Sequence, residues 1–290
     1  MKHSNFKRAA IFYRSETAKG RAWNKKITAW LQENYPQIKI LNSEKPPKNK
    51  KTAPDLVIAL GGDGTILEAA RRYHTYNSLI IGLNLGRIGF LASIRKEENF
   101  LSGLGLMLKG KYKADPRLMI SAALYRKNKT VVKLRAVNDV SVQNLSGLVQ
   151  LKISVKGHPL QNINGSGVLV ATATGSTAYN LSLHGPIVMP NIRCFIITEI
   201  SDHNIPTPSV VIKRDETIVI DVEDFRKQNK FIIAKTGKKT DVILTIDGFE
   251  IIPLQKGDKI IIQESQHAIH FAELDKNYFF KSLQEKFAFK

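Results

Sequence analysis

Cysteine is almost absent from this chain, which has a single one, Cys194, among 290 residues. One cysteine cannot form an intrachain disulfide, which is typical of proteins in a reducing compartment such as the cytoplasm. Long apolar runs are also missing, and no stretch reaches the roughly 20 apolar residues that a membrane-spanning helix needs. The N-terminal residues MKHSNFKR are followed by no apolar segment that resembles a signal peptide. We therefore expect a cytoplasmic protein that does not contact a membrane.

Two common sequence signatures are missing as well. The pattern Gly-x4-Gly-Lys-[Ser/Thr] does not occur, which excludes the P-loop type of ATPase. The histidines, including His184 and His267, have no cysteine or acidic partner at ligand spacing. We therefore predict no structural zinc and assign no side chain to a metal.

Acidic residues are few relative to basic ones. The 44 Lys and Arg against 25 Asp and Glu give a net charge of +19 at pH 7. Such a charge attracts polyanions, among them nucleotides, polyphosphate and nucleic acids. Aromatic residues do not alternate with the basic ones in a stacking pattern, so nucleic-acid binding is not expected.

The first part of the chain alternates predicted strands and helices. Predicted strands cover residues 8–13, 38–41, 56–60 and 79–83, and predicted helices cover residues 18–35, 66–72 and 97–108. This alternation predicts a parallel sheet flanked by helices. In such sheets, ligands bind beyond the carboxyl ends of the strands.

Beyond about Lys113, short alternating strands separated by turn residues dominate, which is typical of an antiparallel sandwich. They are predicted at residues 118–125, 131–137, 148–155, 167–171, 195–198, 217–222, 242–246 and 259–264. We therefore expect an α/β domain over residues 1–113 and a β-sandwich domain over residues 114–274. A short helical tail over residues 275–290 follows, and the sequence leaves open whether it packs back on the first domain.

The sequence Gly-Gly-Asp-Gly-Thr at residues 61–65 lies between a predicted strand and a predicted helix. A helix that begins there points unpaired backbone N–H groups and the positive end of its dipole at the turn, which makes an anion site. Asp63 adds a carboxylate, which phosphate binding alone does not need. A carboxylate at this position can accept a proton from an attacking hydroxyl group or hold Mg²⁺. The turn favours phosphoryl transfer, although Gly and Asp also form ordinary tight turns.

Two further segments offer contacts of the same kind. Residues 84–91 follow a predicted strand, and Arg87 can bind phosphate or carboxylate with its forked guanidinium. Residues 165–182 run from a strand into a Gly-Ser-Thr turn and a helical turn, where Tyr179 can stack on a base or ribose. The predicted phosphate and nucleotide contacts are Gly61, Gly62, Gly64, Thr65, Asn84 and Arg87.

Five segments, in this order, resemble the bacterial type of NAD kinase. They are residues 61–65, 84–91, 138–139 (Asn-Asp), 174–179 (TGSTAY) and 247–248 (Asp-Gly). Several motifs in a fixed order are more specific than any one of them. The resemblance implies an α/β nucleotide-binding domain with a parallel sheet, followed by an all-β sandwich domain that contributes NAD-binding residues.

The resemblance also implies a reaction. NAD kinases transfer the γ-phosphoryl group of ATP, bound with Mg²⁺, to the 2′-hydroxyl of the adenosine ribose of NAD, which gives NADP. Asp63 matches the proton acceptor of the family, and Gly64 lies beside it in the turn. Asn138 and Asp139 match an asparagine and an acidic residue that bind NAD through its base and ribose. The second NAD-binding stretch of the family matches Thr177, Ala178, Tyr179, Asn180, Leu181 and Ser182.

Four positions depart from the family pattern. Glutamate is usual where this chain has Asp139, and a polar residue such as glutamine where it has Phe249. Aspartate is usual at Ser166 and a basic residue is often found at Asn164. Because Asn164 and Ser166 remove charges from the cofactor-binding pocket, the sequence leaves open the substrate affinity and the preference between NAD and NADH.

Other interpretations share part of these features. A lipid or diacylglycerol kinase has the Gly-Gly-Asp-Gly turn, but segments 84–91 and 174–182 argue against it. Phosphofructokinase-like sugar kinases have the turn and lack the later segments. A non-catalytic polyanion-binding protein is suggested only by the charge of +19. The altered pocket residues also leave open a weakened regulator with the same fold.

The sequence alone leaves open which compound donates the phosphoryl group and how many copies of the chain assemble. The positive charge is compatible with inorganic polyphosphate as donor as well as with ATP. The resemblance implies a homodimer or homotetramer formed through the β domain, with the NAD site completed by a neighbouring subunit. The expected partners are thus NAD, ATP and further copies of the chain.

Overall fold

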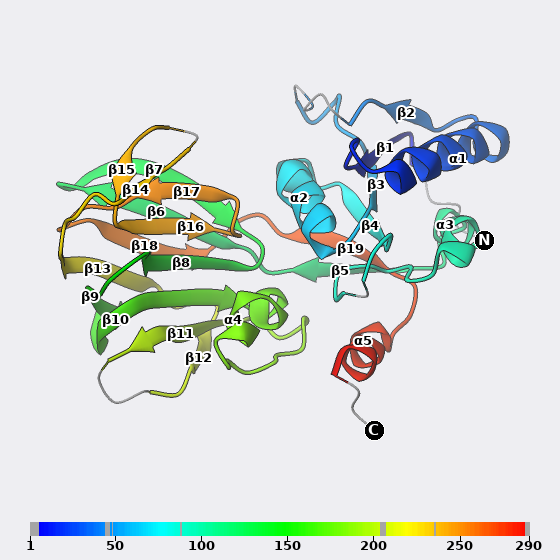
Figure 1. Ribbon diagram of the computed structural model, residues 1–290. Coiled ribbons are helices and arrows are strands. Elements are labelled where there is room, and N and C mark those ends of the chain that lie inside the picture. Colours follow the sequence, from blue (N-terminus) through cyan, green and yellow to red (C-terminus); the bar gives the residue numbers. More distant parts are fainter. Residues whose placement is uncertain are drawn as a thin grey trace. The chain divides into compact units, whose positions relative to one another are not determined.

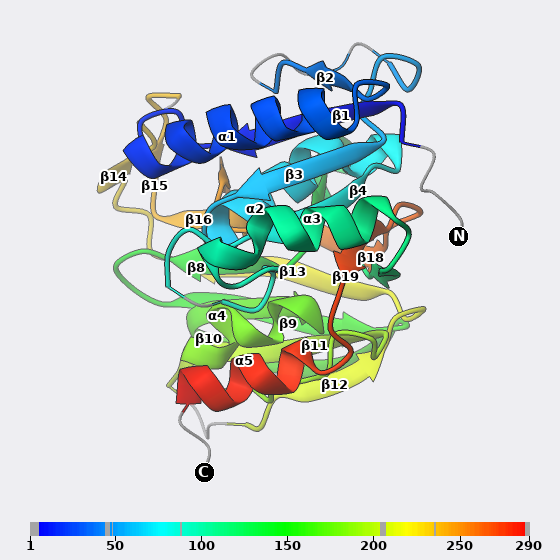
Figure 2. The same ribbon diagram turned by 90° about the vertical axis from the view of Figure 1, so that its right-hand side faces the viewer.

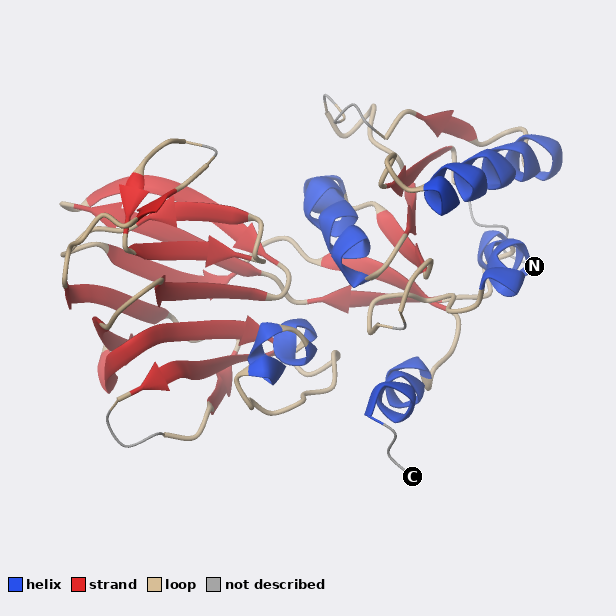
Figure 3. Cartoon of the chain, in the orientation of Figure 1, coloured by secondary structure: helices blue, strands red, loops and turns tan. Residues whose placement is uncertain are grey.

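The chain divides into two compact units in the computed structural model, which describes residues 6–43, 47, 49–87, 89–203, 207–234 and 236–287. Unit 1 comprises Met1–Arg117 and His267–Lys290, and unit 2 comprises Leu118–Gln266. Figure 3 shows that unit 1 combines helices with strands, whereas unit 2 consists almost entirely of strands. Among the described residues, no helix has the length and apolar character to cross a membrane.

Unit 1 is built on a six-stranded sheet with the order β2-β1-β3-β4-β19-β5. Its strands are β1 (Arg8–Tyr13), β2 (Lys39–Leu41), β3 (Leu56–Leu60), β4 (Leu79–Leu83), β5 (Lys113–Arg117) and β19 (Ile269–Glu273). All neighbours pair in parallel except β19 and β5, which are antiparallel. The predicted parallel sheet is thus confirmed, and β3 and β4 are buried along their whole length, as expected for continuously apolar strands.

Helices cover both faces of this sheet (Figure 1). The helices of unit 1 are α1 (Ala18–Asn34), α2 (Asp63–Tyr73), α3 (Phe100–Leu108) and α5 (Tyr278–Phe287), with short 3-10 turns at His74–Tyr76 and Glu97–Asn99. Ile27 and Leu31 of α1 and Phe100 of α3 share one apolar cluster with the strands. Figure 2 shows α1 and α3 on the same side of the sheet, and α2 packs on the other side.

Unit 2 is an antiparallel sheet of eleven strands that encloses one apolar core. Its main path runs β17-β16-β8-β10-β9-β13-β18-β6-β7, and β11 and β12 continue from β10. The strands are β6 (Ile120–Arg126), β7 (Lys129–Ala136), β8 (Asp139–Asn144), β9 (Val149–Val155), β10 (His158–Thr172), β11 (Cys194–Asp202), β12 (Val210–Lys213), β13 (Ile218–Phe225), β16 (Val242–Ile246), β17 (Glu250–Pro253) and β18 (Lys259–Glu264). The predicted sandwich is confirmed.

Two smaller features complete unit 2. A separate hairpin pairs β14 (Phe231–Ile232) with β15 (Lys239–Thr240). The 3-10 turn Thr174–Thr177 and the one-turn helix α4 (Tyr179–Ser182) follow β10, as the sequence of residues 165–182 predicts.

Several strands differ from the sequence-based prediction. Strand β10 extends over His158–Thr172 rather than 167–171, because its first half pairs with β9 and its second half with β8 and β11. Strands β5, β8, β12, β17 and β19, together with the β14–β15 hairpin, were not predicted. Strand β5 contains Pro116 and lies at the edge of the sheet, where a residue without an N–H is tolerated.

Candidate active site

The Gly-Gly-Asp-Gly-Thr turn connects β3 to α2 in unit 1. Gly62 is the N-cap of α2, and Asp63 is the first helical residue. A side chain at Gly61 would place its Cβ 2.6 Å from Oγ1 of Thr65, which is buried beneath the turn. The first N–H groups of α2 have no partner within the helix, and Gly64 beside them is exposed. This end of β3 therefore has the geometry of an anion site.

The carboxylate of Asp63 is held by the backbone of the loop 84–91. Its Oδ2 accepts the N–H of Phe90 at 2.8 Å, and its Oδ1 accepts the N–H of Leu91 at 3.1 Å. A Cβ on Gly89 would lie 2.1 Å from Oδ1, so only glycine allows the loop to approach this closely. Because each carboxylate oxygen has a second lone pair, Asp63 is oriented and can still accept a proton or a hydrogen bond.

Asn84 and Arg87 take different positions in the same loop. Asn84 is buried, and its Nδ2 donates to the carbonyl of Gly86 at 2.9 Å while its backbone N–H donates to Ile94 at 2.9 Å. Its side chain thus shapes the loop. Arg87 is exposed and free to reach a ligand, and residue 88 lies outside the described part of the chain.

Arg14 is a cation near the turn that the sequence analysis missed. It follows β1, which pairs in parallel with β3, so the carboxyl ends of both strands lie at one edge of the sheet. Its Nη2 lies 3.9 Å from the position that a Cβ on Gly64 would occupy. The available signal was its place directly after a strand of the parallel sheet.

Unit 2 contains the second group of predicted residues, and Asp247 organises it. Asp247 and Gly248 have φ values of 50° and 69° and form the hairpin turn between β16 and β17, as expected for an Asp-Gly pair. The Asp247 carboxylate accepts the N–H groups of Val137, Asn138 and Asp139 at 2.9, 2.7 and 3.1 Å. Asp247 therefore fixes the backbone on which Asn138 and Asp139 stand.

Asp139 has an unusual electrostatic environment. It is the first residue of β8, and only 6% of it is exposed. Burial, together with the nearby charge of Asp247, raises the pKa of Asp139 to about 7. Burial and the charge of Asp139 also raise the pKa of Tyr179. At neutral pH the Asp139 carboxyl group can therefore exist in both protonation states.

Asn138 presents an unused hydrogen-bond acceptor. Within the part of the chain that the structure describes, its buried Oδ1 has no hydrogen-bond partner. Such an atom is costly in a folded protein unless a ligand or water supplies a donor. Its backbone carbonyl accepts the N–H of Thr172 at 2.8 Å, and Gly175 packs so closely that a Cβ there would lie 2.2 Å from the same oxygen.

The residues 177–182 divide between exposed and structural positions. Thr177, Ala178, Tyr179 and Leu181 are partly exposed and Ser182 is exposed. Asn180 is fully buried, and its Nδ2 donates to the carbonyls of Ser176 at 3.3 Å and Pro186 at 3.1 Å. Thr198 donates to Oδ1 of Asn180 at 2.8 Å. The Asn180 side chain thus stabilises the turn that presents its neighbours.

Asn164 and Ser166 lie in another part of unit 2. Ala171 of β10 pairs with Asp139, and Ser166 is five residues further back along this strand. Five extended residues span roughly 17 Å, so within one chain Ser166 is remote from Asp139. Asn164 lines a hollow of about 490 Å³ with Gln150 and Arg226. The structure therefore does not bring these two residues to the Asn138–Asp139 group of the same unit.

Comparison with known proteins identifies the class. Sequence models of the ATP-NAD kinase N-terminal and C-terminal domains match residues 9–112 and 137–274. The NAD kinase of Natranaerobius thermophilus is 35% identical over 80% of this chain and 77% of its own length. The NAD kinase of Treponema denticola is 36% identical over 80% of this chain and 78% of its own length.

Solved structures share the fold. Yeast NADH kinase complexed with NADH has a TM-score of 0.86 at 22% identity, covering 98% of this chain and 88% of that one. An NAD kinase from Archaeoglobus fulgidus in complex with ATP has a TM-score of 0.75 at 23% identity, covering 96% and 98%.

These findings agree on one class of protein, the phosphotransferases known as kinases. Within that class, the chain belongs to the NAD kinase family. The comparisons give no support to a lipid kinase or to a non-catalytic polyanion-binding protein.

Proposed function

We propose that this chain transfers the γ-phosphoryl group of ATP to the 2′-hydroxyl of the adenosine ribose of NAD, which yields NADP and ADP. The observation that carries the proposal is the Asp63 carboxylate, which the N–H groups of Phe90 and Leu91 orient at the start of α2. The NAD kinase relatives support the choice of substrate.

Asp63 acts as the general base in this proposal. One of its oxygens accepts the proton of the 2′-hydroxyl while O2′ forms a bond to the γ-phosphorus. The bond between that phosphorus and the bridging oxygen of ATP breaks, and ADP leaves with the electron pair. The donor would be ATP bound with Mg²⁺, which would neutralise part of the phosphate charge.

The turn and its neighbours bind the phosphates. The N–H groups at the start of α2 supply donors directed at an anion, and the small residues of the turn let phosphate oxygens approach the backbone. Arg87 and Arg14 add positive charge at the same sheet edge. The contacts proposed for this role are Gly61, Gly62, Gly64, Arg87 and Arg14. Thr65 is buried and supports the turn from beneath, its N–H donating to the carbonyl of Gly62, and Asn84 shapes the loop.

NAD is bound by residues of unit 2. The unpaired Oδ1 of Asn138 is suited to an N–H donor of the base, and ionised Asp139 to ribose hydroxyl groups. Tyr179 supplies a ring for stacking, and its partly or fully exposed sequence neighbours Thr177, Ala178, Leu181 and Ser182 supply further contacts. Asn180 supports this stretch from within the fold.

We also propose that the chain acts as a cytoplasmic homodimer or homotetramer. The support is the distance of roughly 17 Å along β10 between Ser166 and Ala171, the residue that pairs with Asp139. Ser166 and Asn164 can serve an NAD site if they are supplied by a neighbouring copy of the chain. Sedimentation of the purified protein measures the assembly directly.

The test is NADP formation from NAD, ATP and Mg²⁺, followed by chromatography. Asp63→Asn keeps the shape of the side chain and removes the base, so activity should fall by about 10²–10⁴-fold. Glu68→Gln on the same helix is the matched control and should retain activity. If the folded wild-type chain makes no NADP or NADPH with NAD or NADH, and with ATP or polyphosphate, the proposal is wrong.

A further inference from the structure

Helix α5 packs on the loop that holds Asp63. We propose that α5 is a positioning element for catalysis, which acts on Asp63 through Phe90. This inference rests on the proposed role of Asp63 as general base, and every residue that carries it belongs to unit 1.

The contact between α5 and the loop is aromatic. Phe90, Tyr278 and Phe279 form a buried cluster, which Phe287 borders. The ring centre of Phe90 lies 5.9 Å from that of Phe279 and 6.3 Å from that of Phe287. Nζ of Lys286 lies 5.0 Å from the same ring centre. The ring of Phe90 is therefore held from several sides by α5.

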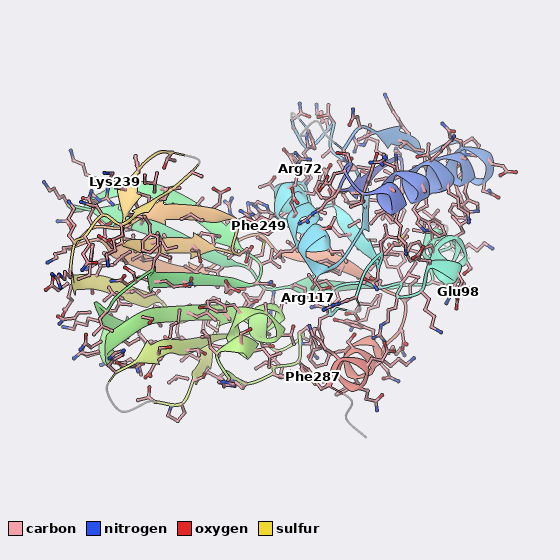
Figure 4. All side chains as sticks on the ribbon, in the orientation of Figure 1. Arg72, Glu98, Arg117, Lys239, Phe249 and Phe287 are labelled. Atoms are coloured by element: carbon pink, nitrogen blue, oxygen red, sulfur yellow. The ribbon has the colours of Figure 1, made fainter. Side chains whose placement is uncertain are left out.

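Polar contacts fix α5 itself. At its first residue, the hydroxyl of Tyr278 accepts a hydrogen bond from Arg117, whose buried guanidinium also pairs with Asp115 and Glu273. Near its other end, Glu285 pairs with Arg95 at 2.8 Å. Figure 4 labels Arg117 of this polar group and Phe287 of the aromatic contact.

The step from packing to chemistry is short. The backbone N–H of Phe90 is a direct donor to Oδ2 of Asp63, and the next residue, Leu91, donates to Oδ1. A shift of the Phe90 ring moves both donors together, because they are adjacent in the chain. A catalytic group displaced by about 1 Å can lose on the order of 10²-fold in rate.

The experiment compares two neighbouring phenylalanines of α5. Phe279 is 6% exposed and contacts Phe90, whereas Phe280 is 49% exposed. Phe279→Ala should lower kcat by roughly tenfold or more and leave KM for NAD and ATP within about twofold. It should also accelerate hydrogen exchange at the N–H groups of Phe90 and Leu91. Phe280→Ala should change neither kcat nor the hydrogen exchange of these two N–H groups. Phe279→Leu should retain most of the wild-type kcat.

The two hypotheses can fail separately. If the wild-type chain forms no NADP, the proposed function fails, while hydrogen exchange still tests the α5 contact. If Phe279→Ala accelerates exchange and leaves kcat unchanged, α5 only stabilises the fold and the inference is wrong. Equal effects of Phe279→Ala and Phe280→Ala would also overturn it.

Unit 2 contains a separate feature, a lysine-rich hollow of about 620 Å³ beside the β14–β15 hairpin. From its charge, which is independent of Asp63, we infer that it binds a small anion that carries several phosphate groups. Its lining includes the cations Arg126, Lys227, Lys238, Lys239 and Lys256. Figure 4 labels Lys239 on this hairpin.

The charges in this hollow are unevenly compensated. Arg126 pairs with Asp258 at 2.6 Å, and Lys256 pairs with Asp224. Asp241 is the single acidic residue in the described lining. Burial raises its pKa, but the three backbone N–H groups that it accepts together lower the pKa overall. Among the described residues, no carboxylate lies within ion-pair distance of Lys227, Lys238 or Lys239. Three positive charges are therefore available to a ligand.

The size of the hollow and its polar side chains favour a small ligand. Its volume lies within the range of small-molecule sites, and Asn229, Thr240 and Gln255 add hydrogen-bonding groups. Lysine binds phosphate as a point charge without a fixed direction. A chain of a few phosphate groups can pair with three lysines at once, whereas a single phosphate group cannot reach all three.

Calorimetric titration with inorganic tripolyphosphate tests this site. The wild-type chain should bind it, and the affinity should fall at least tenfold in the combined variant Lys227→Gln, Lys238→Gln and Lys239→Gln. The matched control removes the same charge from exposed strand positions of unit 2, through Lys129→Gln, Lys133→Gln and Lys152→Gln. It should change the affinity less than twofold.

Other outcomes overturn the inference. An equal loss in both combined variants would mean that tripolyphosphate responds only to the net charge of the protein. Binding of a single-stranded oligonucleotide without binding of tripolyphosphate would make the hairpin a nucleic-acid surface.

Discussion

Unit 1 and unit 2 use aspartate in opposite ways. In unit 1 the carboxylate of Asp63 is partly exposed, and backbone N–H groups hold it in one orientation. In unit 2 the carboxylate of Asp247 holds the backbone, and beside it the buried Asp139 has a pKa raised to about 7. The same side chain is thus an oriented carboxylate proposed as the base, a structural acceptor or a titrating group, according to its surroundings.

The comparison also shows how each unit limits substitution. The Asp63 carboxylate proposed as the base in unit 1 depends for its position on the absence of a side chain at Gly89. The NAD-binding residues proposed for unit 2 depend on the presence of one at Asp247. Substitutions at these two positions should therefore damage different properties, namely turnover in unit 1 and stability in unit 2.

Among the substitutions that test this comparison, Gly89→Ala should have the largest effect on turnover. The added Cβ would lie 2.1 Å from Oδ1 of Asp63, so either the carboxylate or the loop must move. We expect kcat to fall by about 10²-fold with little change in thermal stability. Gly86→Ala is the matched control in the same loop, because a Cβ there meets nothing within 4 Å. Equal kcat values for the two variants would show that the position of Asp63 does not limit the rate.

Asp247→Ala should mainly reduce stability. The substitution removes the acceptor of three backbone N–H groups, which are left without a partner in a largely buried turn. We expect a loss on the order of 3 kcal/mol in the free energy of unfolding, measured by urea denaturation. Asp247→Asn keeps one acceptor oxygen and should lose less. If both variants unfold at the wild-type midpoint, Asp247 does not fix this backbone.

Asp139 should make stability depend on pH. Because its folded pKa of about 7 exceeds the ordinary value of 3.8, the folded state binds more protons than the unfolded state between these values. The free energy of unfolding should therefore fall as pH rises from about 4 through 7, by at most on the order of 4 kcal/mol from this group. Asp139→Asn should flatten that fall in urea denaturation at a series of pH values, and an unchanged slope would contradict the assignment.

Arg14→Gln should have the smallest effect. The exposed guanidinium near Gly64 adds to the positive potential at the turn, so its loss should raise KM for ATP by roughly three- to tenfold at low salt. The difference should shrink as ionic strength rises. Lys25→Gln on the exposed side of α1 is the control and should leave KM unchanged.

Local pattern was enough for several elements. Strands β1, β3 and β4 were predicted with their observed bounds, because each is a short apolar run before a turn signal. The turn after β3 follows from its glycines, although the helix after it starts at Asp63 rather than at the predicted residue 66. The change in periodicity along the chain likewise predicts an α/β part followed by a β sandwich.

The site was predicted less completely. The motifs pointed to Asp63, Asn138 and Asp139, and the structure shows the contacts that surround each of them. No motif indicated that Asn180 is buried or that Arg14 lies near Gly64. Exposure and proximity depend on residues far apart in the chain, so local pattern does not report them.

By itself, the sequence determined the order of the apolar strands, the turn that carries Asp63 and the family to which the chain belongs. Only the tertiary structure decided that β19 joins the first sheet, that α5 packs on Phe90 and that Asp139 titrates near neutral pH. Hydrophobic periodicity and turn chemistry act over a few neighbouring residues, so they can be read along the chain. Pairing of distant strands, burial of a carboxyl group and packing of a terminal helix arise only when distant segments meet.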